Sequence, residues 1–113
     1  MLTDHFNKYL KRNKLQNNQI IVATFYKFIQ LKKILEIRNH LNSYFEASNI
    51  KGTILVAKEG INGTIAGGKV DLHNFFEKLS FHSEFSDISP KYSICNKNPF
   101  LRRKIRIKKE IVT

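Results

Sequence analysis

The sequence contains few of the residues that build covalent or metal-held structure. Its 113 residues include one cysteine, Cys95, and four histidines that lack the spacing of a metal site. A single cysteine excludes an internal disulfide bond and a zinc site with several thiolate ligands from one chain. Because 42% of the residues are apolar, including nine phenylalanines and four tyrosines, one compact hydrophobic core has to hold the fold. We expect no bound metal.

Long hydrophobic runs are missing as well. No apolar stretch approaches the roughly 18–20 residues needed to cross a bilayer. Residues 1–14 are polar and charged, without the hydrophobic segment of a signal peptide. These two absences predict a cytoplasmic protein.

Acidic residues are scarce relative to basic ones. There are 9 aspartates and glutamates against 20 lysines and arginines, so the formal net charge is +11. An excess of positive charge of this size attracts polyanions. Nucleic acid is favoured over an anionic membrane surface, because neutralising its phosphates releases condensed counterions. A genome-wide bias toward lysine, isoleucine and asparagine is the alternative explanation. Bias would spread the charge, whereas much of it lies near the two ends, at 8–14 and 97–109.

The apolar pattern divides the chain into a polar start and a folded part. Residues 1–19 are expected to form a polar basic N-terminal arm, with 11–19 as a linker or frayed segment. The folded part, 20–113, should begin near Ile20. There the β-branched and aromatic run 20–26 predicts a strand that is buried on both faces or central in a sheet.

Helical and strand periodicities alternate along the rest of the chain. Apolar residues at helix spacing predict a helix from Leu31 to about residues 47–49 and a second helix around 72–79. Strands at 50–57 and 63–67 flank a turn at 59–63 and indicate a β-hairpin, and further strands are expected at 91–95 and 101–112. The order βαββαβ, with one extra or continued strand, predicts an α+β, ferredoxin-like sandwich in which two helices cover one face of an antiparallel sheet.

The last of these strands carries the strongest candidate for an RNA contact. Its six basic residues are Arg102, Arg103, Lys104, Arg106, Lys108 and Lys109. Alternation projects the even-numbered ones from one face at intervals of about 6.6–7 Å, which is commensurate with a nucleic-acid backbone. The alternative is an edge strand whose charges protect against aggregation.

The predicted turn is a second candidate. It consists of Glu59, Gly60, Ile61, Asn62 and Gly63. Glu59 offers acceptors, and Asn62 offers a donor and an acceptor, to a base or to another domain. The alternative is a purely structural turn, in which the two glycines take positive φ and Asn62 bonds its own backbone.

Aromatic residues of the first strand are the third candidate. Tyr26 and Phe28 could offer stacking surfaces to unpaired bases. Aromatic side chains in such a run also belong to cores, which is the interpretation that we prefer for Phe25 and leave open for Tyr26.

Residues 51–67 carry a family resemblance, centred on Glu-Gly-Ile-Asn-Gly at 59–63. With Phe25-Tyr26-Lys27-Phe28 before it and 106–112 after it, this segment resembles the amino-terminal domain of the rhodanese-related tRNA uridine hydroxylases, over roughly residues 20–113. The resemblance implies an acylphosphatase-like form of the ferredoxin-like fold, followed by a rhodanese domain that we expect beyond residue 113. It also implies formation of 5-hydroxyuridine at the tRNA wobble position, with molecular oxygen as co-substrate.

The same resemblance locates the chemistry outside this chain. In the family the catalytic cysteine lies in the rhodanese domain and is followed by glycine and arginine, whereas Cys95 is followed by Asn96-Lys97-Asn98. We therefore expect no catalytic residue and no cofactor in this domain. The implied partners are tRNA, at its anticodon region, and the rhodanese domain in cis; no membrane partner is expected.

Three classes of function follow from these observations. The leading hypothesis is an RNA-binding, substrate-positioning domain; the rival is a scaffold domain that docks onto the rhodanese domain without contacting RNA. The third is an independent small enzyme. Acylphosphatase chemistry needs a glycine-rich loop with an arginine after the first strand, and residues 27–33 contain neither residue type.

Overall fold

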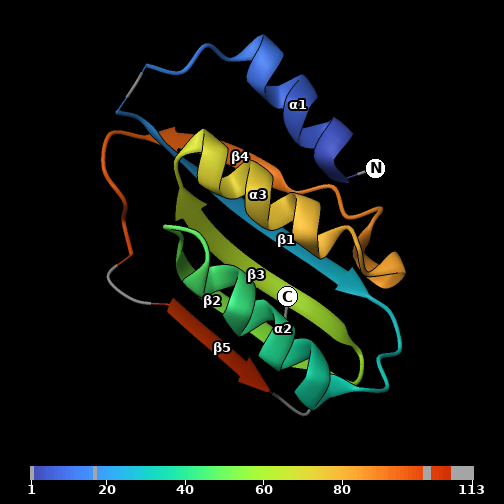
Figure 1. The fold of residues 1–113 in the computed structure, drawn as a ribbon. Coiled ribbons are helices and arrows are strands. Elements are labelled where there is room, and N and C mark those ends of the chain that lie inside the picture. The colour runs from blue at the N-terminus through green and yellow to red at the C-terminus, as the bar shows by residue number, and fades with distance from the viewer. Residues whose placement is uncertain (1, 17, 101–102, 108–113) are drawn as a thin grey trace.

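The computed structural model describes residues 2–16 and 18–100, together with the backbone of 103–107. The described chain forms a five-stranded sheet with helices on one side of it (Figure 1). In chain order the elements are α1 (Leu2–Arg12), β1 (Ile20–Phe28), α2 (Ile34–Glu46), β2 (Lys51–Ala57), β3 (Gly60–Gly67), α3 (Lys69–Leu79), the short 3-10 helix η1 (Ser83–Phe85), β4 (Lys91–Cys95) and β5 (Arg103–Ile107).

The sheet has the strand order β4-β1-β3-β2-β5. Among the first four of these strands each neighbouring pair is antiparallel, as the α+β, ferredoxin-like prediction requires, and that prediction is confirmed. β5 is the extra strand. It lies at the edge opposite β4 and runs parallel to β2. The two strands that follow Pro90 in the sequence therefore border the sheet on opposite sides.

A helix precedes β1, which corrects the expectation of a polar arm at 1–19 and of a folded part beginning near Ile20. Leu2 and Phe6 are buried on one side of α1, and the Phe6 ring lies 5.3 Å from the Phe76 ring of α3 and 5.5 Å from the Tyr92 ring of β4. The segment is polar on average. The 11 residues of α1 form about three turns, whose apolar stripe continues through Tyr9 and Leu10, and the high density of charge around it concealed this stripe.

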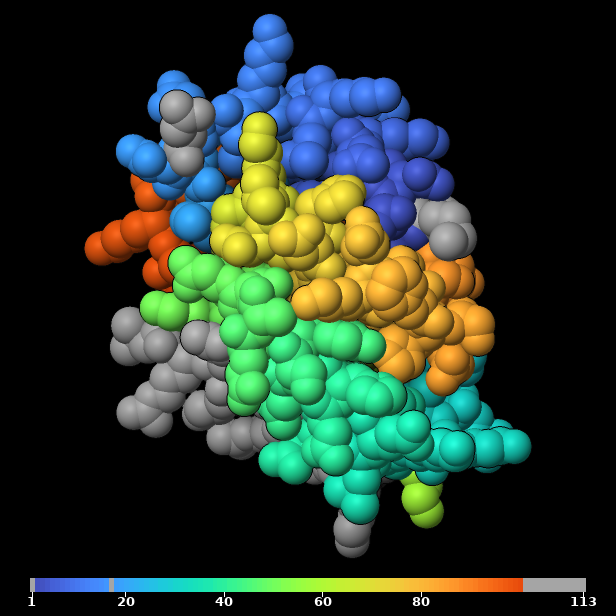
Figure 2. Space-filling view, viewed as in Figure 1, coloured from blue at the N-terminus to red at the C-terminus, as the bar shows by residue number. Residues whose placement is uncertain are grey.

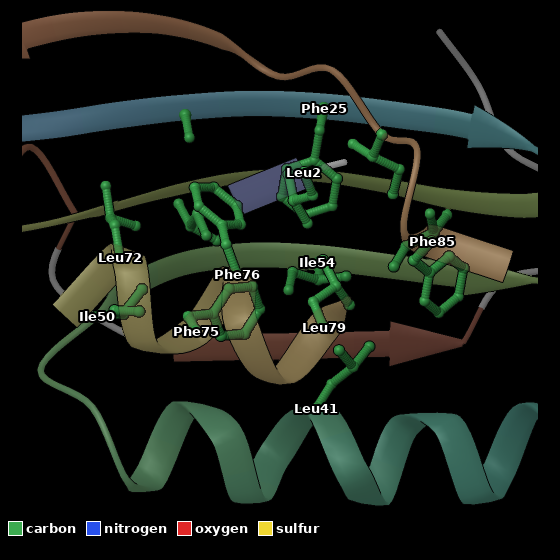
Figure 3. Packing of buried hydrophobic residues seen from close by; sticks show 14 of the residues in the cluster. Leu2, Phe25, Leu41, Ile50, Ile54, Leu72, Phe75, Phe76, Leu79 and Phe85 are labelled. Atoms are coloured by element: carbon green, nitrogen blue, oxygen red, sulfur yellow. The ribbon is translucent and has the colours of Figure 1, made fainter. Parts of the chain in front are cut away.

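The hydrophobic core lies between the sheet and the helices. Figure 3 shows side chains from β1, β2, α1, α2 and α3 meeting there, and Figure 2 shows α1, α3 and α2 closing this side of the molecule. In β1 burial alternates: Ile21, Ala23 and Phe25 are buried, while Thr24 and Tyr26 are exposed. β1 is therefore internal to the sheet, as expected, but buried on one face only.

The helices of the described residues are short. None of them is long and apolar enough to cross a membrane.

Candidate nucleic-acid interface

The sheet has a second face that no helix of the described chain covers. On β1 this open face carries Thr24, Tyr26 and Phe28, which alternate with the buried residues. Tyr26 is 58% exposed and Phe28 56% exposed. Their ring centroids lie 5.8 Å apart in an edge-to-face arrangement, whereas Phe25 is 2% exposed and belongs to the core. Two aromatic side chains are thus exposed to solvent on this face of the sheet.

Strand register aligns open-face residues into rows that cross the sheet. One row joins all five strands and consists of Lys91, Thr24, Thr64, Thr53 and Lys104, in that order from β4 to β5. We call it the Lys-Thr row. The Thr24 and Thr64 hydroxyl oxygens lie 3.4 Å apart. Directly opposed residues of neighbouring strands project to the same face, so this row is continuous across β4, β1, β3 and β2.

A second row lies beside the first, two residues further along β1. It consists of Tyr26, Asn62, Leu55 and Arg106. The aromatic pair and Asn62 therefore flank the threonines. The continuous β-branched and aromatic run at 20–26 contains no signal for the outward direction of Thr24 or for the cross-strand alignment, and the Lys-Thr row was missed for that reason.

The Lys-Thr row ends at β4 in a groove of about 440 Å³. β4 pairs with β1 only as far as Thr24, opposite Lys91, so the last residues of β1 have no β4 partner. Tyr26 and Lys91 line the groove together with the 87–89 segment. On the wall of the groove the Lys27 ammonium donates a hydrogen bond to the Asp87 carboxylate and forms an ion pair with it. This contact holds the pKa of the Asp87 carboxyl below its usual value. Lys91 is exposed at the rim.

The predicted basic strand lies only partly within the described residues. Arg103, Lys104 and Arg106 belong to β5, an edge strand that pairs with β2 alone among the described strands. Arg102, Lys108 and Lys109 lie outside the described residues. The register places Lys104 beside Thr53 and Arg106 beside Leu55. An RNA contact and protection of the edge both stay as interpretations of this strand.

The predicted turn at 59–63 is shorter in the structure. The hairpin turn comprises Lys58 and Glu59, and β3 begins at Gly60. Glu59 is exposed, and its carbonyl accepts a hydrogen bond from Ile29 N at 2.9 Å, which ties the turn to the β1–α2 connection. Gly60 to Gly63 are strand residues paired with both β1 and β2. This corrects the prediction that the whole segment forms the turn.

The two glycines of this segment have separate structural causes. Gly60 has φ of +147°, and a Cβ there would collide with the backbone carbonyl of Lys27. Gly63 does not have positive φ, but a Cβ on it would lie 2.7 Å from the Phe25 ring. The buried Ile61 adds to the core. Asn62 is partly exposed and pairs with Tyr26 in the register, which places it on the open face.

A histidine cluster lies on the helix side and was not anticipated, since its members are far apart in sequence. The rings of His40 and His82 are 5.4 Å apart, and Tyr44 Oη lies 2.8 Å from His82 Nε2. Burial, and then the neighbouring His40, lower the pKa of His82. Across the described residues, no group of three or more histidine, cysteine, aspartate or glutamate side chains could hold a metal ion.

Comparisons with known proteins agree with this architecture. The family model described as "UPF0176 acylphosphatase like domain" matches residues 20–111. A tRNA uridine(34) hydroxylase of Legionella pneumophila (strain Lens) is 42% identical over 94 residues, which cover 83% of this chain and 37% of the relative. One of Sinorhizobium medicae (strain WSM419) is 43% identical over 95 residues, covering 84% and 30%. One of Acaryochloris marina (strain MBIC 11017) is 39% identical over 95 residues, covering 84% and 31%.

The similarity to solved structures is weaker. A full-length HypF in the phosphate- and nucleotide-bound form has a TM-score of 0.44 at 14% identity and covers 79% of this chain and 12% of that chain. The chain spans 30–37% of the length of the three curated relatives above. The resemblance to tRNA uridine hydroxylases inferred from residues 51–67 is confirmed, and the chain belongs to the family of the UPF0176 acylphosphatase-like domain.

Proposed function

We propose that this chain is the RNA-binding, substrate-positioning domain of a tRNA uridine(34) hydroxylase, which forms 5-hydroxyuridine with molecular oxygen as co-substrate. The relatives named above supply the reaction class. The observation that carries the role of this domain is the open sheet face with its exposed aromatic pair, Tyr26 and Phe28. Because the chain spans only a part of these relatives, the reactive thiol is assigned to a rhodanese domain in cis.

The exposed aromatic pair fits single-stranded RNA for two reasons. Aromatic rings on an uncovered sheet bind unpaired bases by stacking, and this interaction tolerates any base because every base has a π-face. The formal net charge of +11 supplies the attraction to phosphate that aromatic residues lack. A wobble uridine lies in the anticodon loop, where bases are unpaired, so such a face suits the substrate.

The chain's own thiol fits a structural role. Cys95 is partly buried in β4, and its register neighbour on β1 is the apolar Ile20. A reactive cysteine needs a cation, a histidine or a helix N-terminus that stabilises its thiolate. We therefore assign no catalytic residue and no cofactor to this domain.

Salt-dependent binding tests the proposal. The 113-residue chain should bind an anticodon stem-loop, and the logarithm of the association constant should fall linearly with the logarithm of the salt concentration. Charge reversal of Lys104 and Arg106 to glutamate should weaken this binding with the fold intact. The matched control reverses Lys11 and Lys69, which are exposed on α1 and α3, on the helix side. Absence of binding at low ionic strength would refute the proposal. An equal loss of affinity in both charge-reversal variants would show that the RNA contact is not specific to β5.

The alternative is a scaffold domain that docks onto the rhodanese domain. The same aromatic pair favours it, because exposed aromatic side chains also anchor protein interfaces. A tight complex between this chain and a separately produced rhodanese domain, without affinity for RNA, would establish that alternative.

A further inference from the structure

The Lys-Thr row has the composition of a binding path for a nucleic-acid backbone, and we call this path the track. We propose that a single strand of RNA crosses the open face along this row, roughly perpendicular to the strands, from β4 toward β5. Its phosphates and riboses contact Lys91, Thr24, Thr64 and Thr53, and its bases lie toward Tyr26 and Asn62. The proposal rests on the RNA-binding function proposed above. It adds the path of the RNA across the sheet, the residues that contact its backbone and the number of nucleotides that are bound.

The register makes the row continuous from one edge of the sheet to the other. Lys91 opposes Thr24, Thr24 opposes Thr64, and Thr64 opposes Thr53, each as a direct antiparallel pair. Thr53 in turn lies beside Lys104 in the parallel pairing of β2 with β5. A lysine therefore stands at each edge of the sheet, with one threonine on each of the three strands between them. The 3.4 Å separation of the Thr24 and Thr64 hydroxyls shows how tightly the row is spaced at its centre.

The residue types suit a sugar-phosphate backbone. A threonine hydroxyl donates a hydrogen bond to a phosphate oxygen and can donate to or accept from the ribose 2′-hydroxyl, while lysine neutralises phosphate as a point charge. The row contains no carboxylate. The acidic neighbour at its β4 end, Asp87, is already paired with Lys27.

The second row is placed for the bases. Same-face residues along a strand are two positions apart, about 6.6–7 Å, so Tyr26 lies that far from Thr24 and Asn62 that far from Thr64. A backbone on the threonines can thus reach the Tyr26 ring with its base. An asparagine amide carries both a donor and an acceptor of the kind that recognises a base edge, and Asn62 lies beside Tyr26 in this row. The groove beside Tyr26 and Lys91, about 440 Å³ in volume, accommodates the nucleotide at the β4 end.

The sheet also sets the length of the bound segment. Five strands include four inter-strand spacings, and at about 4.8 Å each the row spans about 19 Å. That span corresponds to roughly four nucleotides, the lower end of the site sizes of single-strand grooves. Affinity should therefore rise with oligonucleotide length up to about four residues and then change little per added residue.

A structural explanation of the same row exists and makes the opposite prediction. Threonine forms strands well on a solvent-exposed face, and lysine on edge strands prevents aggregation. Under that explanation, removing the hydroxyls or one edge charge changes RNA binding no more than removing any other surface charge.

The test uses fluorescently labelled oligouridylates of two, four and eight residues and the 113-residue chain. Lys91→Gln removes one row charge, and Lys69→Gln removes one charge from the helix side as the matched control. Lys91→Gln should reduce the slope of log K against log salt by about 0.7, the value for one single-strand phosphate contact, and Lys69→Gln should leave the slope unchanged.

The hydroxyls are tested together. The triple variant Thr24→Val, Thr53→Val, Thr64→Val keeps the β-branched shape and should weaken RNA binding by roughly tenfold, with an unchanged melting temperature. It should also lose part of the preference for RNA over DNA of the same sequence, since the 2′-hydroxyl contact is removed. A triple variant that binds like the wild type refutes the track, as does a Lys91→Gln variant that behaves like Lys69→Gln.

Two results separate this proposal from the one on which it rests. If the chain binds the anticodon stem-loop but none of the oligouridylates, the track is refuted and the RNA-binding function stands. If it binds neither RNA at low salt, both are refuted.

Discussion

Replacing Tyr26 with alanine is the most direct test of the open face. The side chain is 58% exposed, and the aromatic partner described for it is Phe28, whose ring centroid is 5.8 Å away. An edge-to-face pair contributes about 0.5–1.5 kcal/mol, against a total stability of about 5–15 kcal/mol for a domain. The Tyr26→Ala variant should therefore remain folded, and any loss of RNA binding can be assigned to the surface itself.

The expected loss of affinity follows from stacking. Base–aromatic stacking contributes about 1–3 kcal/mol per base in alanine substitutions. At 1.4 kcal/mol per factor of ten, this corresponds to about a 5- to 140-fold weaker complex. Because alanine keeps the net charge, the slope of log K against log salt should not change. A loss of affinity at constant slope distinguishes stacking from electrostatic attraction.

Fluorescence anisotropy with a labelled anticodon stem-loop measures both quantities. Tyr26→Phe preserves the ring and should bind within about twofold of the wild type, since the π-face is retained. Phe81→Ala is the matched control, because Phe81 is 75% exposed but follows α3 on the helix side. If Tyr26→Ala binds as tightly as Phe81→Ala, Tyr26 does not stack on RNA and the reasoning from the open face fails.

Three further predictions concern the fold and its pH dependence. Phe6→Ala should lower the free energy of unfolding by about 3–5 kcal/mol in a denaturant titration, because the ring is fully buried between α1, α3 and β4. Gly60→Ala should lower it by about 1–3 kcal/mol or more, because φ is +147° and a Cβ would collide with the Lys27 carbonyl. Stability should also fall as the pH drops through the ordinary histidine pKa of 6.5. Burial and His40 lower the pKa of His82 in the folded protein, so the unfolded chain binds the proton more readily. Melting curves between pH 7.5 and 5 measure this loss.

Matched variants make these predictions specific. Phe81→Ala removes an exposed ring and should leave the free energy of unfolding nearly unchanged, in contrast to Phe6→Ala. Gly68→Ala should be tolerated, since its Cβ would meet only Asp71 Oδ2 at 3.7 Å. His82→Gln should flatten the pH dependence between 7 and 5.5. An unchanged profile in that variant would assign the dependence to other groups.

Local periodicity was sufficient for most of the secondary structure. The stripe Leu72, Phe75, Phe76 and Leu79 predicted α3, and all four residues are buried. The β-branched run from Ile20 predicted β1, because such residues fit a pleated, packed strand. Both signals arise from neighbours in the sequence, so a single chain is enough to detect them.

Local signals failed where burial was sparse or pairing extended a strand. α1 was missed because its average composition is polar and charged, although Leu2, Phe6, Tyr9 and Leu10 recur at helix spacing and pack against the core. Gly60 and Gly63 suggested a turn, yet both residues pair with β1 and β2 and therefore belong to β3. Glycine is compatible with a turn, with a strand that another group approaches closely, and with a strand of unusual backbone conformation. The tertiary neighbours select among these: the Lys27 backbone at Gly60 and the Phe25 ring at Gly63.

The sequence by itself determined the ferredoxin-like order of elements, the strong positive charge and the family, because propensity, periodicity, charge and a short motif are properties of the linear chain. The tertiary structure alone decided that Tyr26 and Phe28 face solvent, and that Lys91 and three threonines fall into one row with Lys104. Register is the physical reason. It depends on pairings between residues of β1 and β3 that are 32 to 46 positions apart in the sequence, and a shift by one residue would move the side chains of Thr24, Tyr26 and Thr64 to the opposite face.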